Sequence, residues 1–311
     1  MDALASLLTG PRARGAFLMR SMMSAPWSIR IEDEAPLTIV LAVTGAAWIT
    51  PDEGPRLRLG PGDAVVIRGP EPYEVGDDRG TAPQVIIRPG QECVTLDGQD
   101  VSDRMGLGIR SWGNSSRPET ILLTGSYESV GEISRPLLDA LPRSITLTAD
   151  QQPGPLVEYL TVEIGREAPG QEAVLDRLLD LLLIAVLRSW FVAQADRAPG
   201  WYRASTDREI GAVLAMIHDH PADPWTVTSL AAAAGISRAT LARRFGSLVG
   251  QSPMSYLAGW RLALAADLLH DPDRTLDSIA RQVGYGSAFA LSTAFKRRHG
   301  VSPSAFRARA A

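Results

Sequence analysis

The sequence of 311 residues contains one cysteine, Cys93, and no histidine before residue 218. A single cysteine cannot form a disulfide within the chain or supply the several thiolates of a structural zinc site. A metal centre in the first two thirds of the chain would need two or three histidines beside a carboxylate. All four histidines come later, at His218, His220, His270 and His299. The first two stand near the end of a predicted helix, where a cationic side chain suits the helix dipole. We predict no metal and no cofactor.

Long hydrophobic runs are also absent. The most apolar stretch, LLDLLLIAVL at residues 178–187, contains Asp180 and is followed by Arg188. It falls well short of the ~20 apolar residues that cross a bilayer. The first six residues lack the basic and apolar regions of a secretory signal peptide. We therefore expect a cytoplasmic protein without a membrane partner.

The net charge of −4 hides an asymmetry along the chain. Residues 201–311 carry 13 basic and 8 acidic side chains, whereas residues 1–200 carry 18 basic and 27 acidic ones. From residue 236 onward the contrast is 11 basic against 4 acidic. A basic C-terminal third joined to an acidic body predicts a polyanionic partner for the C-terminal third alone.

The spacing of apolar residues changes along the chain. Residues 1–150 hold short apolar runs separated by Gly, Pro and Asp, as in the strands of a sandwich or small barrel. In residues 171–195 a stripe recurs at steps of three and four, as on one face of a helix: Leu175, Leu178, Leu182 and Val186. Residues 207–309 indicate helices broken by Gly and Pro. We predict an α+β, multi-domain chain with a β-rich domain at 1–150, a helical connector at 151–204 and an all-α domain at 205–311.

The C-terminal third contains an internal repeat. SLAAAAGISRATLARRFGSLVGQSPMSY is matched by SIARQVGYGSAFALSTAFKRRHGVSPSAF once one extra residue is allowed after the first glycine. The matches include Gly235 with Gly284, Ser237 with Ser287, Leu241 with Leu291, Phe245 with Phe295 and Pro253 with Pro303. Two copies are too few for a solenoid, so each copy is expected to be a small unit packed beside its twin.

Each copy has the signals of two helices joined by a tight turn. In the first, Thr226 is a predicted N-cap, Gly235 a left-handed C-terminal residue and Ser237 the N-cap of a second helix. Leu241 and Phe245 lie four residues apart and predict one buried face. In the second copy the corresponding residues are Thr275, Gly284, Ser287, Leu291 and Phe295. This is the helix-turn-helix plan, which places its second helix in the DNA major groove. A continuous helical pattern over residues 255–269 would hold the two recognition helices about one DNA turn, ~34 Å, apart.

The tandem pair resembles the arabinose-regulator (AraC/XylS) family of bacterial transcription regulators, over roughly residues 207–309. The resemblance implies a sequence-specific DNA-binding transcription regulator with double-stranded DNA as its partner. The resemblance also favours a homodimer through the 171–195 helix. The alternative is that the apolar stripe of this helix covers the β-rich domain. RNA polymerase and a small-molecule effector are the further candidate partners.

The resemblance assigns candidate DNA contacts by position. Those of the first recognition helix are Ser237, Arg238, Ala239, Thr240, Ala242, Arg243 and Arg244. Those of the second are Ser287, Ala288, Phe289, Ser292, Thr293, Lys296, Arg297 and Arg298, with Ala290 in a further base-reading slot. The family's base-reading positions fall on Ala239, Ala242 and Arg243 in the first helix, and on Ala288, Phe289, Ala290 and Thr293 in the second. Among these, only Arg243 has the forked donor group that suits a guanine edge. We therefore expect the second helix to contribute mainly phosphate contacts.

The N-terminal half resembles, more weakly, the cupin-type sensor domain of one branch of the same family, through APWSIRI, VTGAAWI and LGPGDAVVI. Four aromatic residues are candidates for an apolar ligand pocket, with plain core as the alternative: Trp27, Trp48, Tyr73 and Trp112.

Cys93 leaves four readings open. It is a passive small hydrophobe, a redox or electrophile sensor, an alkyl acceptor as in regulators that repair DNA, or the nucleophile of an enzyme fused to a DNA-binding module. The last reading is the rival to a regulator that lacks enzymatic activity.

Overall fold

The structure is a computed structural model that describes residues 17–127, 134–152, 154–194 and 199–310. Contacts divide these residues into two compact units. One contains residues 17–127 and 141–193, and the other contains residues 134–140 together with the helices that follow residue 194. Each unit has a hydrophobic core of its own.

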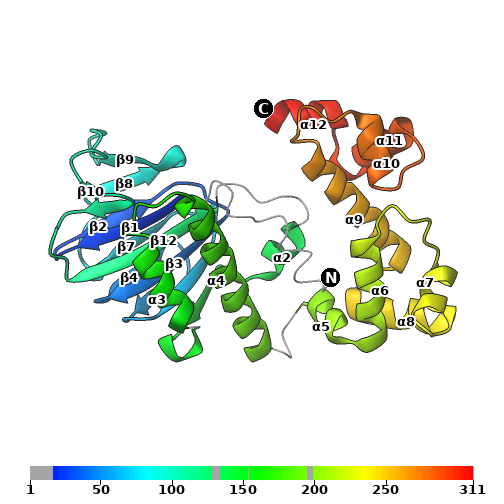
Figure 1. The fold of residues 1–311 in the computed structure, drawn as a ribbon, viewed down its shortest axis with the longest axis horizontal. Coiled ribbons are helices and arrows are strands. Elements are labelled where there is room, and N and C mark those ends of the chain that lie inside the picture. The colour runs from blue at the N-terminus through cyan, green and yellow to red at the C-terminus, as the bar shows by residue number, and fades with distance from the viewer. Residues whose placement is uncertain (1–16, 128–133, 153, 195–198, 311) are drawn as a thin grey trace. The chain divides into compact units, whose positions relative to one another are not determined.

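The first unit contains two β-sheets that enclose a common core (Figure 1). The larger sheet has the strand order β10-β11-β1-β12-β3-β6-β13, and the smaller has the order β5-β4-β7-β2-β8-β9. Neighbouring strands are antiparallel except in the pairs β1–β11 and β2–β8. The strands are β1 Phe17–Met23, β2 Ser28–Ile31, β3 Leu37–Thr44, β4 Ala47–Pro51, β5 Leu57–Leu59, β6 Ala64–Arg68, β7 Tyr73–Gly76, β8 Val85–Arg88, β9 Glu92–Thr95, β10 Gly106–Gly108, β11 Ser111–Gly113, β12 Thr120–Tyr127 and β13 Ser144–Leu147.

Strand β3 shows that the larger sheet is covered on both faces. Its first six residues, LTIVLA, are all buried. Because successive side chains of a strand point to opposite faces, neither face of β3 is open to water. Val40 and Ala42 join the core between the sheets, together with Ile49 and Val75 of the smaller sheet. The other face is covered by helix.

Helix α4, Gln171–Ala193, lies on the outer face of the larger sheet, beside α3, Gly154–Glu163 (Figure 1). Gly125 in β12 permits the close approach, because a Cβ atom there would collide with the side chain of Leu179. The buried face of α4 consists of Gln171, Leu175, Leu179, Leu182, Leu183, Val186, Leu187 and Phe191. Three of the four residues in the predicted stripe therefore pack inside the unit, which favours the reading of this helix as a cover for the β-rich domain.

The second unit is helical. Its elements are α2 Arg135–Ala140, α5 Gly200–Thr206, α6 Arg208–Asp219, α7 Val227–Ala233, α8 Arg238–Val249, α9 Pro253–Leu268, α10 Leu276–Gln282, α11 Ala288–His299 and α12 Pro303–Ala310. Figure 1 shows α9 running from the α6–α8 group to the α10–α12 group. The predicted fold class, a β-rich N-terminal part followed by a tandem of helix-turn-helix units, is confirmed. Among the described helices, none has the length and apolar character needed to cross a bilayer.

Candidate DNA-binding surface

The first helix-turn-helix unit consists of α7 and α8. The Thr226 side chain accepts a hydrogen bond from the Ser229 amide at 3.0 Å, and Ser229 Oγ accepts one from the Thr226 amide at 2.9 Å. Gly235 has a φ of 69°, in the left-handed region where a side chain is unfavourable. Ser237 Oγ then accepts from the Thr240 amide at 3.1 Å and begins α8. The caps and the turn are those predicted, so short-range backbone requirements place the start of α8.

Helix α8 has one buried and one exposed face. Leu241 and Phe245 are fully buried, and the Phe245 ring packs edge-on to that of Tyr256 at 5.7 Å between centroids. The side chains on the opposite face are exposed: Arg238, Ala239, Ala242 and Arg243. Within the part of the chain that the structure describes, Arg243 forms no ion pair. A free guanidinium therefore stands on a helix whose position is fixed by its caps and core.

Arg244 differs from its neighbour. Its guanidinium lies 2.6 Å from a carboxylate oxygen of Asp207 and 3.2 Å from one of Glu209, both at the start of α6. Burial works in the opposite direction, but the Ile210 amide and the Arg244 guanidinium together hold the pKa of Asp207 below its ordinary value. The prediction of Arg244 as a DNA contact is therefore revised, because its side chain is used to join α8 to α6.

The second helix-turn-helix unit, α10 and α11, repeats this construction. Thr275 Oγ1 accepts from the Ser278 amide at 3.2 Å, and Ser287 Oγ from the Ala290 amide at 3.2 Å. Gly284 has a φ of 83°, and a Cβ atom there would lie 2.8 Å from Ala222 Cα, so only glycine fits the turn. The predicted core residues Leu291 and Phe295 are fully buried. The two units thus share their caps, their turns and their buried pairs.

The exposed side of α11 differs from that of α8. Phe289, in the first turn, is 82% exposed, and Lys296 is exposed two turns further along the same side. Thr293 Oγ1 donates to the Phe289 carbonyl at 3.0 Å, so its hydroxyl is left only as an acceptor. Where α8 has Ala239 and Arg243, α11 has Phe289 and Thr293. The second helix therefore offers an aromatic ring and a cation at its C-terminal end in place of a forked donor.

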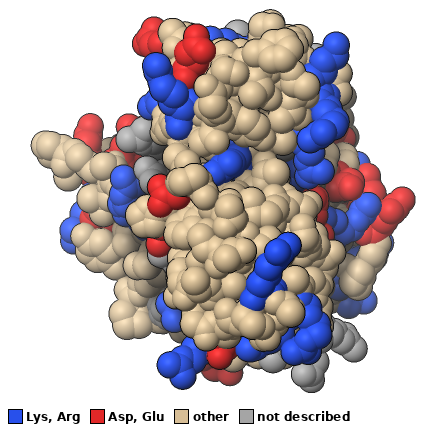
Figure 2. Space-filling model, turned by 90° about the vertical axis from the view of Figure 1, so that its right-hand side faces the viewer, with Lys and Arg blue, Asp and Glu red and all other residues tan. Residues whose placement is uncertain are grey.

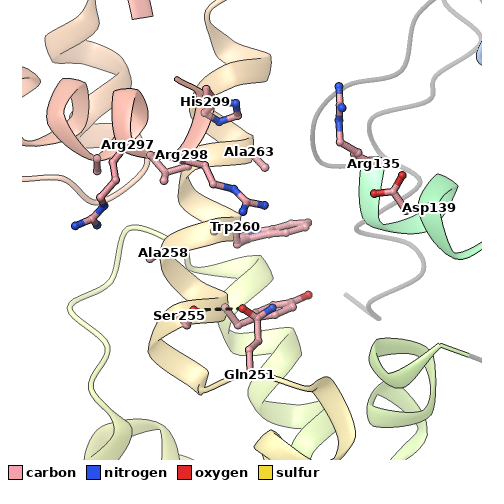
Figure 3. A pocket seen from close by; sticks show the side chains of 14 residues that line it. Arg135, Asp139, Gln251, Ser255, Ala258, Trp260, Ala263, Arg297, Arg298 and His299 are labelled. Atoms are coloured by element: carbon pink, nitrogen blue, oxygen red, sulfur yellow. Dashed lines mark hydrogen bonds between the residues drawn. The ribbon is translucent and has the colours of Figure 1, made fainter. Parts of the chain in front are cut away.

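The basic residues that end α11 do not share one side of the helix. Figure 3 shows Arg297 and Arg298 pointing to different sides, with Arg298 extending toward Trp260. The hollow there is lined by α9 and the end of α11, with Arg135 and Asp139 of α2 also in its wall. Successive helical residues are ~100° apart, which puts Arg298 on nearly the opposite side from Lys296. We therefore revise the prediction for Arg298, which faces this hollow and not the side that carries Phe289 and Lys296.

Several basic residues of the C-terminal third hold the helical unit together. Arg261 donates to the carbonyls of Pro221 at 2.6 Å and Asp223 at 2.7 Å, and Arg307 donates to the carbonyls of Leu269 and Arg274. Arg281, at the exposed end of α10, was not among the predicted contacts although it forms no ion pair within the described residues. In Figure 2, which faces the helical unit, Lys and Arg side chains form several groups with uncharged surface between the groups. The charge available to DNA is therefore smaller than composition alone suggests.

The comparisons with known proteins match this arrangement. Residues 2–192 match the model of a cupin family, and residues 230–309 match that of a helix-turn-helix domain family. A putative AraC-like transcription regulator of Streptomyces antibioticus is 30% identical, over 99% of this chain and 98% of that protein. The chain belongs to the AraC-like family of transcription regulators. The regulator AlkR of Acinetobacter baylyi is 29% identical over 99% of both chains, and MtrA of Neisseria gonorrhoeae is 28% identical over 99% of this chain and 98% of its own. The predicted family and the function of a DNA-binding transcription regulator are confirmed.

In this AraC-like regulator the four candidate pocket aromatics lie in three different places. Tyr73 and Trp112 line a cavity between the two sheets of the cupin domain. Trp27 is 1% exposed and belongs to the core. Trp48 is only partly buried, and the Arg79 guanidinium lies 3.8 Å from the centre of its ring. Tyr73 and Trp112 are therefore placed where a ligand could bind, which stays a prediction, and Trp27 and Trp48 do not line the cavity.

The same cavity is also lined by residues that were not predicted to line a pocket. Asp33 and Cys93 lie in its wall. Burial raises the pKa of the Cys93 thiol, and its Sγ donates weakly to the Gln91 carbonyl at 3.6 Å. A nucleophilic cysteine needs the opposite shift toward the thiolate, so this environment speaks against the rival hypothesis of an enzyme. Within the described residues no cluster of three or more His, Cys, Asp or Glu side chains is arranged to hold a metal ion.

Proposed function

We propose that this AraC-like regulator binds its operator through two unequal helix-turn-helix units, in the cytoplasm and without enzymatic activity of its own. Residues 205–311 form the DNA-binding domain, residues 1–150 the cupin domain that senses a small molecule, and residues 151–204 the connector. The observation that carries the proposal is the contrast between α8 and α11. Arg243 is exposed on α8 and has no ion-pair partner in the part of the chain that the structure describes, while α11 has Phe289 and Lys296 on its exposed side.

The proposal divides the two recognition helices by role. Arg243 reads a guanine edge, a contact worth ~1–3 kcal/mol of discrimination. Arg238, Ala239, Thr240 and Ala242 lie around it, where the alanine methyl groups suit thymine methyls. Lys296 and Arg297 contact phosphates, with Ser292 and Arg281 close to the backbone. Ser237 and Ser287 act mainly as caps.

The test compares Arg243→Ala with Lys296→Ala in the full chain, on operator fragments selected from random DNA. Arg243→Ala is expected to weaken specific binding about 5- to 150-fold and to relax the preference at one base pair. Lys296→Ala should weaken specific and non-specific binding alike and lower the salt slope by about one. Arg58→Ala, which removes one exposed positive charge from the cupin domain, is the matched control. Equal losses of specificity from the two test variants would contradict the division of roles.

A homodimer through the 171–195 helix is part of the proposal, but not through the stripe that the sequence indicated. Leu175, Leu182 and Val186 are buried against the sheet. Leu181 and Val192 are 51% and 71% exposed and lie three helical turns apart on one side of α4. We expect Leu181→Glu to shift sedimentation toward the monomer, whereas Val162→Glu, an equally exposed apolar residue on α3, should not. A monomeric wild type at micromolar concentration would refute the dimer.

A further inference from the structure

The cavity of the cupin domain lies between the two β-sheets and is mostly apolar. Its wall includes Met19 and Leu122 of the larger sheet, Ile29 and Val75 of the smaller one, and the ring of Trp112. Side chains of this kind favour a hydrocarbon or aromatic surface over water. The cavity measures about 60 Å³, so it suits a small organic molecule with a short apolar part.

One charged side chain faces this apolar space. Among the described residues that line the cavity, Asp33, which follows strand β2, is the only charged one, and none of the others is Arg, Lys or His. Asp33 accepts a hydrogen bond from the Ala35 amide at 3.1 Å and is partly buried. Within the described residues it has no ion-pair partner. A carboxylate in an apolar cavity without a protein cation is best compensated by a cation that arrives with the ligand.

Two further features favour a positively charged ligand. Tyr73 and Trp112 present aromatic rings to the same space, and an ammonium group is attracted to the face of such rings. Residues 1–200 carry 27 acidic and 18 basic side chains, so the surrounding field attracts cations. A carboxylate or phosphate ligand would meet Asp33 without any cation to pair with it.

We propose that this cavity binds a small organic cation, an amine with a short alkyl body, with its ammonium group at Asp33 and its alkyl part against Trp112. The inference rests on the proposed sensing role of the cupin domain and adds the chemical class of the effector. A neutral analogue with the same body binds more weakly, and the corresponding carboxylic acid binds least.

Cys93 provides a local measure of occupancy. It is the only cysteine of the chain and its side chain lines the cavity. A molecule seated between the sheets shields its thiol from alkylation, whereas a molecule bound elsewhere leaves the rate unchanged. The reporter therefore locates the ligand and needs no knowledge of the operator.

The experiment uses the full chain and three compounds that share one propyl group: propylamine, 1-propanol and butyrate. Alkylation of Cys93 by N-ethylmaleimide is followed by intact mass at increasing concentrations of each compound. The amine is expected to halve the rate at a concentration at least tenfold lower than the alcohol, and the acid to have no effect. Equal protection by all three compounds, or no protection by the amine, would overturn the proposal.

The matched variants are Asp33→Asn and Asp78→Asn. Both aspartates accept a hydrogen bond from the amide two residues later, so asparagine preserves the local turn in each case. Asp78 is exposed and is not part of the cavity wall. Asp33→Asn should reduce the preference for the amine over the alcohol to less than twofold, and Asp78→Asn should leave it intact. If Asp33→Asn kept the full preference, the assignment of the cation to Asp33 would be wrong.

Failure of this proposal and failure of the proposed function give different results. Operator binding by the same preparation is measured with and without the amine. Loss of the Cys93 protection with intact, Arg243-dependent operator binding overturns only the ligand class. Protection by the amine in a protein that does not bind DNA specifically overturns the regulatory function and leaves the cation site standing.

Discussion

The two helix-turn-helix units use equivalent residues to set the backbone and different residues to face the solvent. In both, a Ser or Thr caps each helix, a left-handed glycine closes the turn and a Leu–Phe pair is fully buried. At the exposed positions Arg243 of the first unit corresponds to Thr293 of the second, and Ala239 corresponds to Phe289. Backbone geometry allows few residue types at a cap or a turn. The exposed side chains face the DNA, so they are free to differ between the two units when the two DNA half-sites differ in sequence.

The largest expected effects concern the part that the units share. Phe245→Ala and Phe295→Ala each remove a fully buried ring and are expected to destabilise their units by about 3–5 kcal/mol. Phe295 has more aromatic neighbours, with His299 at 4.3 Å and Phe306 at 5.3 Å between ring centroids. The measurement is urea unfolding of the full chain, followed by helical circular dichroism. If one of the two variants lost less than half as much stability as the other, the two cores would not be equivalent.

The next prediction concerns His218, which lies on α6, the helix that packs against α7 and α8 of the first helix-turn-helix unit. His218 at the end of α6 is 8% exposed, stacks on Trp260 at 4.1 Å and forms a hydrogen bond of 2.8 Å with Tyr256 Oη. Burial lowers the pKa of His218 from 6.5 to about 4. The expectation of a cationic side chain suited to the helix dipole is therefore wrong for His218, because burial disfavours the charged form of its ring.

The lowered pKa of His218 fixes the sign of a pH effect. Between pH 6.5 and 4 the unfolded chain binds a proton at His218 that the folded chain does not, so stability decreases as the pH falls. The shift corresponds to a loss on the order of 3 kcal/mol across that window. The variant His218→Gln should remove this part of the pH dependence, whatever its effect on stability at pH 7. An unchanged slope of stability against pH in urea unfolding would contradict the assignment.

The contrast between the units also shows what the sequence alone could predict. Thr226, Gly235 and Ser237 were predicted correctly because a cap or a left-handed turn depends on residues within a few positions of each other. The ion pair of Arg244 with Asp207 and the burial of His218 beside Trp260 join residues about forty positions apart. No local pattern marks such pairs.

In the cupin domain the same distinction applies. The strand-like runs of residues 1–150 predicted a two-sheet or barrel fold, because apolar alternation and turn residues are local signals. The cavity is formed by side chains from several strands and depends on the order in which these strands pair. Tyr73 and Trp112 are among the four candidate aromatics, but no local pattern separates them from Trp27 or places Asp33 beside them. The domain boundaries at residues 150 and 204 remain predictions.

The smallest predicted effect bears directly on how the second unit reads DNA. Phe289 is 82% exposed at the position where the first unit has Ala239. An exposed ring on a recognition helix can bury thymine methyl groups in the major groove, and each buried methyl contributes ~0.8 kcal/mol, or about fourfold in affinity. Replacing thymine by uracil, one position at a time across the half-site of α11, removes single methyl groups without changing the base pairing. The affinity of the wild type should fall about fourfold when uracil replaces thymine at one or two of these positions. The affinity of Phe289→Ala should be the same for thymine and uracil at those positions. Lys296→Ala, the control, should weaken binding to thymine and uracil DNA by the same factor, because a phosphate contact does not involve the base. If Phe289→Ala left the thymine preference unchanged, α11 would be limited to phosphate contacts. The two units would then differ in that the first contacts bases and the second contacts only the DNA backbone.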